Sequence, residues 1–473
     1  MPSLLPLALC FLAPNAATGA MTSPRPTQGA PASEVVSSRA AAPTITAEVR
    51  FDAAALLALA KGDALPAAFD VAGGRGLRLR HRTHVDAPGN LPDGVHLQFE
   101  HPLRQDREAS LLVREGRVTG FISTGLLRNE LTSPKAGVAF VAAPVAGSDL
   151  PCATAPKHRI PASDDDVGGA NGGAGEGGLA GVPSCDTGSE IDVFVAYTAA
   201  ATAQAGSEPE MIDDILWAIG DSNTIYAESG VAQTIRLVGT APAEGYVEDA
   251  ASMANDLYAL QSPDDGPLDG VLAQAVAAGA DLVALVRANG GGACGIAFLV
   301  GETVDQAAYG VSVTALGCFS NRTFTHELGH NMGCCHAPGD GGGCLSGGVF
   351  PYSTGHRFVG TNGTEYRTVM AYAPGTRIGR FSSPSVVFQG TPTGIADERD
   401  NARSMNTTRL VVANFRCSPC PGDFDGNREV NAADLATMLG NWGVGSAIAD
   451  LNGDDSTDAA DLSILLGNWG ACG

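Results

Sequence analysis

Three histidines and a glutamate lie within residues 326–336, whose sequence is HELGHNMGCCH. On a helix, His326 and His330 are four residues apart and share one face, and Glu327 follows one step round the helix. Two neutral imidazoles in this position can bind Zn²⁺, while the carboxylate takes a proton from a metal-bound water and passes it to a leaving amine. The spacing therefore predicts zinc-dependent hydrolysis of peptide bonds, with Glu327 as the general base.

A third ligand is required, because a catalytic zinc ion keeps three protein ligands and one open position. Gly333 can adopt a positive φ without steric cost, which would end the helix and return His336 to the metal. A structural zinc site would close the fourth position and leave Glu327 without a use. We therefore expect a catalytic site with three ligands, His326, His330 and His336.

Residues 326–336 resemble the extended zinc motif of the metzincins. That resemblance implies a methionine in a tight turn beneath the zinc, and residues 368–372 (TVMAY) are similar to this Met-turn. Met370 would then form a hydrophobic floor under the ligands without bonding to the metal. Astacins and serralysins place a tyrosine where Tyr372 stands, whereas eukaryotic reprolysins usually have a proline nearby. Tyr372 is therefore a hypothetical hydrogen-bond donor to the transition state, which unchanged turnover in a Tyr372→Phe variant would exclude.

Within the metzincins, residues 191–416 most resemble the bacterial reprolysin-like, or adamalysin-type, peptidases. The residues that carry this resemblance lie at 293–297, 324–331, 381–384 and 400–403. It implies a secreted zinc endopeptidase that is made as a zymogen and acts on protein or peptide substrates.

The elements around the zinc motif alternate between strands and helices. Apolar runs predict strands at residues 191–197, 233–238, 281–286, 295–300 and 309–315. Helical periodicity predicts helices at residues 208–229, 251–260 and 268–278. We therefore expect an α/β metzincin catalytic domain with a mixed sheet, against which the active-site helix packs after a cap at Asn321 or Thr323.

The first twenty residues resemble a signal peptide, with an apolar run at residues 4–13 and small residues up to Ala20. The run is too short to cross a bilayer. We therefore expect a secreted protein, whether extracellular, periplasmic or attached to the cell surface, with a signal peptide at residues 1–20 and no integral membrane segment.

Residues 40–160 alternate short apolar runs with Gly, Pro and Asp, a pattern typical of β-strands. Their histidines lack a ligand spacing and are expected at the surface, at positions His81, His84, His96 and His101. Residues 161–185 are Gly-rich and polar, which predicts a flexible linker open to proteolysis. The order is therefore a β-rich propeptide, a linker and a catalytic domain at residues 186–417.

Eleven cysteines include Cys10 in the expected signal peptide, which leaves an even number for disulfides in an oxidising compartment. We expect Cys294 to pair with Cys318, and disulfides, not zinc thiolates, for three cysteines beside the motif, Cys334, Cys335 and Cys344. Cys152 has two interpretations, a thiolate that blocks the zinc or a disulfide with Cys185. Structural disulfides are also expected for Cys417 and Cys420.

Residues 420–473 contain a repeat with a period of 27 residues, from Asp423 to Asp450. Oxygen-bearing side chains recur at loop positions 1, 3, 5, 9 and 12, which predicts Ca²⁺ cages of the EF-hand type with Gly at position 4 and Asp at position 12. The predicted ligands are Asp423, Asp425, Asn427, Asn431 and Asp434, then Asp450, Asn452, Asp454, Asp458 and Asp461. Each loop leads into a helix, so this small α-helical module resembles a type I dockerin. The resemblance implies Ca²⁺-dependent folding and a cohesin-like or cell-surface partner.

The chain of 473 residues has a formal net charge of −23, from 28 Lys and Arg against 51 Asp and Glu. Phosphate binding needs clustered cations, so nucleic acid is excluded as the main partner. The alternative function is calcium-dependent surface assembly or adhesion, with the metzincin domain as a non-catalytic scaffold. The intact Glu327 argues against it, since a decayed enzyme usually loses its general base first.

Overall fold

The computed structural model describes residues 45–50, 69–71, 74–89, 91–124, 128–135, 138–142, 153–154, 188–249, 252–263, 266–288, 290, 292–340, 348–417, 420–425, 429–443, 449–452, 454 and 456–472. Several predictions lie outside these residues. They are the signal peptide at 1–20, the linker at 161–185, the Ca²⁺ ligand Asn427, and the pairing of Cys10, Cys152, Cys185 and Cys344.

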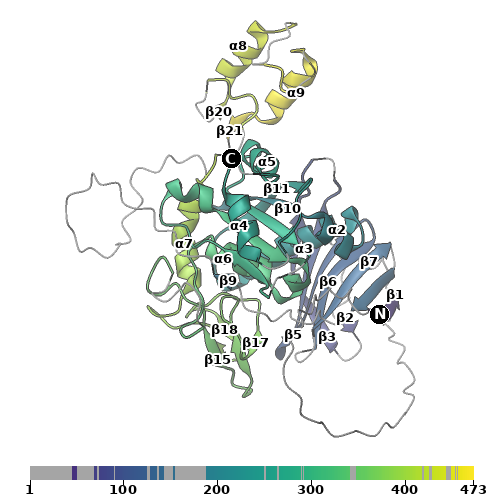
Figure 1. Ribbon diagram of the computed structural model, residues 1–473, viewed down its shortest axis with the longest axis vertical. Coiled ribbons are helices and arrows are strands. Elements are labelled where there is room, and N and C mark those ends of the chain that lie inside the picture. The colour runs from purple at the N-terminus through teal and green to yellow at the C-terminus, as the bar shows by residue number, and fades with distance from the viewer. Residues whose placement is uncertain are drawn as a thin grey trace, which may run out of the picture.

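The catalytic part is built on a six-stranded sheet in the order β11-β10-β12-β14-β13-β9 (Figure 1). Strands β10 (Glu190–Tyr197), β11 (Thr234–Pro242), β12 (Leu282–Arg287) and β14 (Val311–Ala315) are parallel. Strand β13 (Gly295–Ala297) is antiparallel to β14, and β9 (Ala153–Thr154) pairs with its outer edge in the parallel sense. The prediction of a mixed sheet is confirmed, with strand ends that differ by a few residues.

The three helices predicted from periodicity are present as α3 (Glu208–Ser229), α4 (Met253–Gln261) and α5 (Asp269–Ala277). The structure adds α2 (Ala199–Ala205) and α7 (Asn401–Val412), and the zinc motif lies on α6 (Thr323–His330). Helix α3 begins where the Ser207 side chain accepts a hydrogen bond from the Glu210 backbone N–H, and it ends at Gly230 in the left-handed conformation.

The zinc-motif helix α6 begins differently from the prediction. Asn321 belongs to the preceding 3₁₀ helix η2 (Leu316–Asn321), and Thr323 is already helical. The residue between them, Arg322, turns the chain with a φ of 64°, in the left-handed region that few residues other than glycine adopt. Its buried side chain compensates for this strained start, because it is held by two carboxylates.

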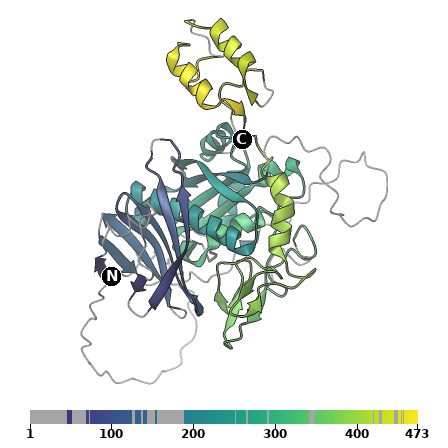
Figure 2. The ribbon, with the colours of Figure 1, turned by 180° about the vertical axis from the view of Figure 1, so that it is seen from behind.

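An eight-stranded antiparallel sheet precedes the catalytic part, in the order β1-β8-β7-β6-β5-β4-β3-β2. Its strands are β1 (Ile45–Arg50), β2 (Phe69–Val71), β3 (Gly74–Val85), β4 (Gly94–His101), β5 (Arg104–Arg114), β6 (Arg117–Thr124), β7 (Arg128–Lys135) and β8 (Val138–Ala142). This sheet, called the N-terminal sheet below, confirms the β-rich prediction. Figures 1 and 2 show it beside the catalytic part, with α3 between the two sheets.

One histidine of the N-terminal sheet contradicts the expectation of surface histidines. His96 is fully buried, because Ser110 and Thr224 satisfy its two ring nitrogens with contacts of 2.8 and 3.2 Å. Burial lowers the pKa of His96 to about 4 and keeps the ring neutral. The sequence around His96 does not reveal that it is buried, because both of its partners lie far from it along the chain.

The cysteines agree with the predictions in part. Cys294 is bonded to Cys318, as expected, and Cys420 is bonded to Cys472. Cys335 and Cys417 are also disulfide-bonded. The expectation of a disulfide at Cys334 is wrong, because this thiol is free and buried, with its sulfur 3.7 Å from the Asn401 carbonyl oxygen.

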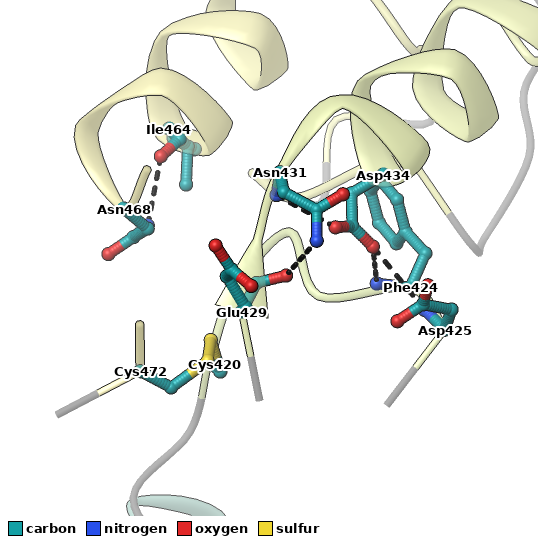
Figure 3. Close-up of a disulfide and its surroundings, with 9 residues drawn as sticks. All are labelled: Cys420, Phe424, Asp425, Glu429, Asn431, Asp434, Ile464, Asn468 and Cys472. Carbon is teal, nitrogen blue, oxygen red and sulfur yellow. Dashed lines mark hydrogen bonds between the residues drawn. A yellow bond between two sulfur atoms is a disulfide. The ribbon is translucent and has the colours of Figure 1, made fainter. Parts of the chain in front are cut away.

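Two short helices form the C-terminal module, α8 (Ala432–Gly440) and α9 (Ala459–Gly467), with the strand pair β20 (Glu429–Val430) and β21 (Gly470–Ala471). Figure 3 shows the Cys420–Cys472 disulfide, which joins the two ends of the module. Among the helices that the structure describes, none is long and apolar enough to cross a bilayer.

Candidate active site

The three predicted zinc ligands converge on one point. The Nε2 atom of His336 lies 3.2 Å from that of His326 and 2.9 Å from that of His330. Zinc–nitrogen bonds of about 2.0–2.1 Å in a tetrahedral site place two ligand nitrogens about 3.3 Å apart. The three imidazoles therefore fit a zinc ion without rearrangement, and they form the most buried potential metal-binding group among the described residues.

The opposite ring nitrogens fix the orientation of two of these imidazoles. The Nδ1 atom of His326 donates to the Val369 carbonyl, and that of His330 donates to the Cys334 carbonyl, each at 2.8 Å. Such bonds set the tautomer that leaves Nε2 as the metal-binding atom. Burial, and then the neighbouring imidazoles, hold the pKa of both rings well below the usual value, so both are neutral.

The chain turn that delivers the third ligand lies at Gly333, which has a φ of 84°. Its backbone N–H bonds to the His330 carbonyl and closes the end of α6. A Cβ atom at this position would come within 2.4 Å of the Val349 side chain. Both the left-handed conformation and this close approach therefore require glycine.

Glu327 is fully buried beside the zinc ligands. Strand β13 runs directly against its carboxylate, because a Cβ atom built on Gly295 would lie 2.2 Å from Glu327 Oε1. Only glycine leaves room for the carboxylate at this point of the strand. The spacing of the zinc motif did not reveal Gly295, although the residue stands in one of the segments that resemble reprolysin-like peptidases.

Met370 lies under the helix that carries the ligands and is fully buried. A Cβ atom on Gly329 of α6 would come within 2.7 Å of the Met370 sulfur, and one on Gly355 would come within 2.8 Å of its carbonyl carbon. Gly329 thus lets the Met370 thioether approach the zinc helix closely, and Gly355 lets its own segment pack against the backbone of the methionine turn.

Tyr372 reaches the metal-binding atoms. Its hydroxyl lies 2.9 Å from His336 Nε2, and the two ring centroids are 4.2 Å apart. Asp340 accepts a hydrogen bond from the Tyr372 backbone N–H at 2.8 Å, and Arg357 pairs with Asp340 and donates to the Tyr372 carbonyl at 3.1 Å. Asp340 and Arg357, neither of which the sequence singled out, therefore hold the tyrosine in place.

His356 is a further buried histidine of the catalytic part, and it is not one of the three grouped zinc ligands. Its Nδ1 atom accepts a hydrogen bond from Arg399 at 3.1 Å, and its ring stacks on Phe358. Burial, with Arg399 and Arg357 nearby, lowers the pKa of His356 to about 4. It supports the fold around the methionine turn, because its backbone N–H donates to the Thr368 hydroxyl and its carbonyl accepts the Thr368 N–H, both at 3.0 Å.

The predicted Ca²⁺ ligands lie in two loops, one in each repeat. Asp423, Asp425 and Asp434 offer carboxylate oxygens within 4.8 Å of one another. In both repeats the position-12 carboxylate also accepts backbone N–H bonds: Asp434 binds Phe424 at 2.7 Å, and Asp461 binds Leu451 at 2.7 Å (Figure 3 shows the first).

The position-9 residues act as helix caps. The side chain of Asn431 accepts from the Ala433 N–H at 2.8 Å, and Asp458 accepts from the Ala460 N–H at 2.7 Å. The remaining ligands lie in the loops, where Asp454 N–H donates to Asp450 at 3.1 Å and to Asn452 at 3.0 Å. These bonds hold the second loop in a tight turn.

Comparison with known proteins agrees with the zinc site. Residues 187–382 match the model of metallo-peptidase family M12. The chain is 31% identical over 237 residues to a peptidyl-Asp metalloendopeptidase of Stenotrophomonas maltophilia, which covers 49% of this chain and 54% of that protein. A peptidyl-Asp metalloendopeptidase of Xanthomonas campestris is 30% identical over 228 residues, or 47% of this chain and 51% of that protein. The chain thus spans about half the length of these relatives.

Among solved structures, metalloproteinase-II from Bacteroides fragilis aligns with 56% of this chain and 78% of its own, at 11% identity and a TM-score of 0.34. The family match ends at residue 382 and leaves the C-terminal repeats uncovered. The match of residues 187–382 to family M12 thus spans strands β10 to β14 of the mixed sheet and the three converging histidines.

Proposed function

We propose that the protein is a secreted zinc-dependent endopeptidase. The observation that carries this proposal is the convergence of three neutral imidazoles beside one buried carboxylate, Glu327. A structural zinc site would close the fourth position with another protein ligand, which would leave no place for a water that Glu327 could activate. The disulfides of the described residues support an oxidising compartment, and hence secretion.

His326, His330 and His336 would hold the zinc ion, which when bound would lower the pKa of a water molecule and polarise the scissile carbonyl. Glu327 then takes the proton of the attacking water and delivers it to the leaving amine. The Tyr372 hydroxyl, held beside His336 by Asp340, donates a hydrogen bond to the oxygen on which negative charge develops.

We further propose that the enzyme cleaves beside aspartate, as the names of its relatives state for those proteins. Arg377, on β17 (Thr376–Arg377), supports this preference. It is buried, it donates to the Asn321 carbonyl at the start of the zinc helix at 2.9 Å, and its charge helps lower the pKa of His326. A cation whose field reaches the zinc ligand His326 would favour a substrate carboxylate bound near the metal.

A matched peptide series tests both the activity and this preference. Peptides that differ only by Asp, Asn, Glu or Ala beside one bond should be cleaved internally, with kcat/KM about 10²-fold higher for Asp than for Asn. Cleavage positions are read by mass spectrometry. Equal rates for Asp and Asn would contradict the preference, and removal of terminal residues alone would contradict the endopeptidase assignment.

We also propose that residues 420–473 bind Ca²⁺. The three carboxylates Asp423, Asp425 and Asp434 gather at the first loop, and the second repeats its backbone bonds. Titration of the full chain, followed by the fluorescence of Trp442 and Trp469, should saturate at micromolar to sub-millimolar Ca²⁺, by analogy with about 10⁻⁷–10⁻³ M for related loops. Mg²⁺ serves as the control, and an identical response to both ions would contradict a dedicated Ca²⁺ site.

Docking of this module onto a cohesin-like or cell-surface partner stays a prediction. Each repeat exposes one leucine and one tryptophan near the end of its helix, namely Leu439 and Trp442 in the first and Leu466 and Trp469 in the second. These matched apolar side chains are the surface that such a partner would contact.

A further inference from the structure

Helix α3 is buried on two opposite sides. Toward the catalytic part, Ser222 is hydrogen-bonded to Thr325 of the zinc helix at 2.7 Å. Toward the N-terminal sheet, Trp217 donates to the Ser110 carbonyl at 3.2 Å and meets Phe121 edge-on, with ring centroids 5.8 Å apart. A helix that is buried all round requires both partners. The sheet and the catalytic part therefore share one hydrophobic core.

Buried charges also cross this contact. The carboxylate of Asp213 on α3 binds Arg114 at 2.5 Å and Arg117 at 2.7 Å, and both arginines belong to the N-terminal sheet. The side chains of Asp213 and Arg114 are 2% and 3% exposed. Removal of one partner from so deeply buried a pair is strongly destabilising.

A second ion pair reaches the start of the zinc helix. The Nη2 atom of Arg322 donates to both oxygens of Glu108 on β5 at 2.9 Å, and its Nε atom donates to Asp221 of α3 at 3.2 Å. The Arg322 carbonyl accepts the backbone N–H of His326 at 3.0 Å. Glu108 is thus connected through one residue to the first turn of the helix that carries the zinc ligands.

We propose that the N-terminal sheet is a permanent part of the active enzyme. It stays bound after the chain is cut between residues 154 and 188, and Glu108 is a positioning residue that fixes the zinc helix through Arg322. A propeptide that dissociated would bare the Trp217 face and leave Asp213 without its arginines. The kinetic part of this proposal rests on the proposed peptidase function, whereas the binding part does not.

The binding part is tested by cutting the full, zinc-loaded chain at a specific protease site placed within residues 161–185. A Cys152→Ser background removes one cysteine that could link the two pieces, and non-reducing denaturing electrophoresis shows that no other link remains. Gel filtration and native mass spectrometry should find both pieces in one species. A folded C-terminal piece that elutes alone would overturn the proposal.

Variants on the sheet sharpen this result. Arg114→Gln removes a buried cation from the contact and should weaken association of the cut pieces about 100-fold, within the range found for buried charge pairs at interfaces. Arg104→Gln, whose side chain is 45% exposed, is the matched control and should leave association unchanged. Equal association of the two variants would contradict an interface held by Asp213.

The positioning part is tested with Glu108→Gln, which keeps the side-chain shape but removes its charge. Zinc affinity and kcat should each fall about tenfold, the lower end of what supporting residues contribute, with KM unchanged. In an Arg322→Met background the same change should have no further effect, since Glu108 acts through Arg322. Asp86→Asn, in the loop directly after β3 and with its carboxylate 71% exposed, is the control.

The outcomes separate the two proposals. Unchanged zinc affinity in Glu108→Gln would refute the positioning role, whatever the activity. Additive losses in the double variant would also refute it. Complete lack of hydrolysis by the wild type, with the pieces still bound to each other, would refute the peptidase function and leave the permanent sheet standing.

Discussion

Glu327→Gln is expected to lower kcat by about 10³-fold, within the range that general acid–base catalysis contributes. The amide has the same shape as the carboxylate, but it cannot take a proton from water. Because Glu327 is not one of the three converging histidines, zinc content should stay at one per chain. Turnover of a quenched peptide and metal analysis of the same sample measure the two quantities.

Two further variants show that the loss comes from this carboxylate. Gly295→Ala would place a Cβ atom 2.2 Å from Glu327 Oε1, so it should displace the carboxylate and lower kcat with zinc retained. Glu302→Gln, on the exposed segment after the same strand, should have wild-type turnover. If Glu327→Gln kept turnover within tenfold of the wild type, Glu327 would not be the general base.

Loss of a zinc ligand is the second change with a large expected effect. His336→Ala leaves two imidazoles, so zinc should be lost on gel filtration and activity should fall about 10³-fold or more, since the metal contributes several kcal/mol of transition-state stabilisation. Chelation of the wild type should produce the same inactive state. Zinc added back should restore the wild type but not the variant.

The control for this experiment is a histidine that lies away from the metal. His84→Ala, whose side chain is 59% exposed, should keep both zinc and activity. Hydrolysis that survived complete removal of zinc from the wild type would contradict a metallopeptidase. Thermal unfolding adds a readout independent of activity, because a metal that binds only the native state raises the midpoint.

Much of the catalytic fold could be predicted because its signals are local. The period of α3 and the apolar runs of β10 and β12 are properties of short segments, and so is the spacing of the zinc ligands. The start of α6 could not be predicted in this way. Arg322 adopts a left-handed φ there, and the carboxylates that hold its guanidinium, Glu108 and Asp221, lie far away in the sequence.

Contacts between distant residues also limited what could be predicted of the active site. Asp340 and Arg357 hold Tyr372, but they are separated from it in the sequence by 32 and 15 residues. His96 has no spacing that marks it as buried, since its partners come from a neighbouring strand and from α3. Contacts of this kind depend on tertiary packing, which residue periodicity does not encode.

The pairing of β9 with β13 has a kinetic consequence. Residues 153–154 occupy the outer edge of the strand that runs against Glu327, and an extended peptide binds most readily to such an edge. Because these residues belong to the same chain, they compete with a substrate at an effective concentration on the order of millimolar. We therefore expect this tethered strand to outcompete a dilute substrate at the β13 edge, and a cut after residue 154 to relieve the competition only in part, because the N-terminal sheet that carries residues 153–154 stays bound.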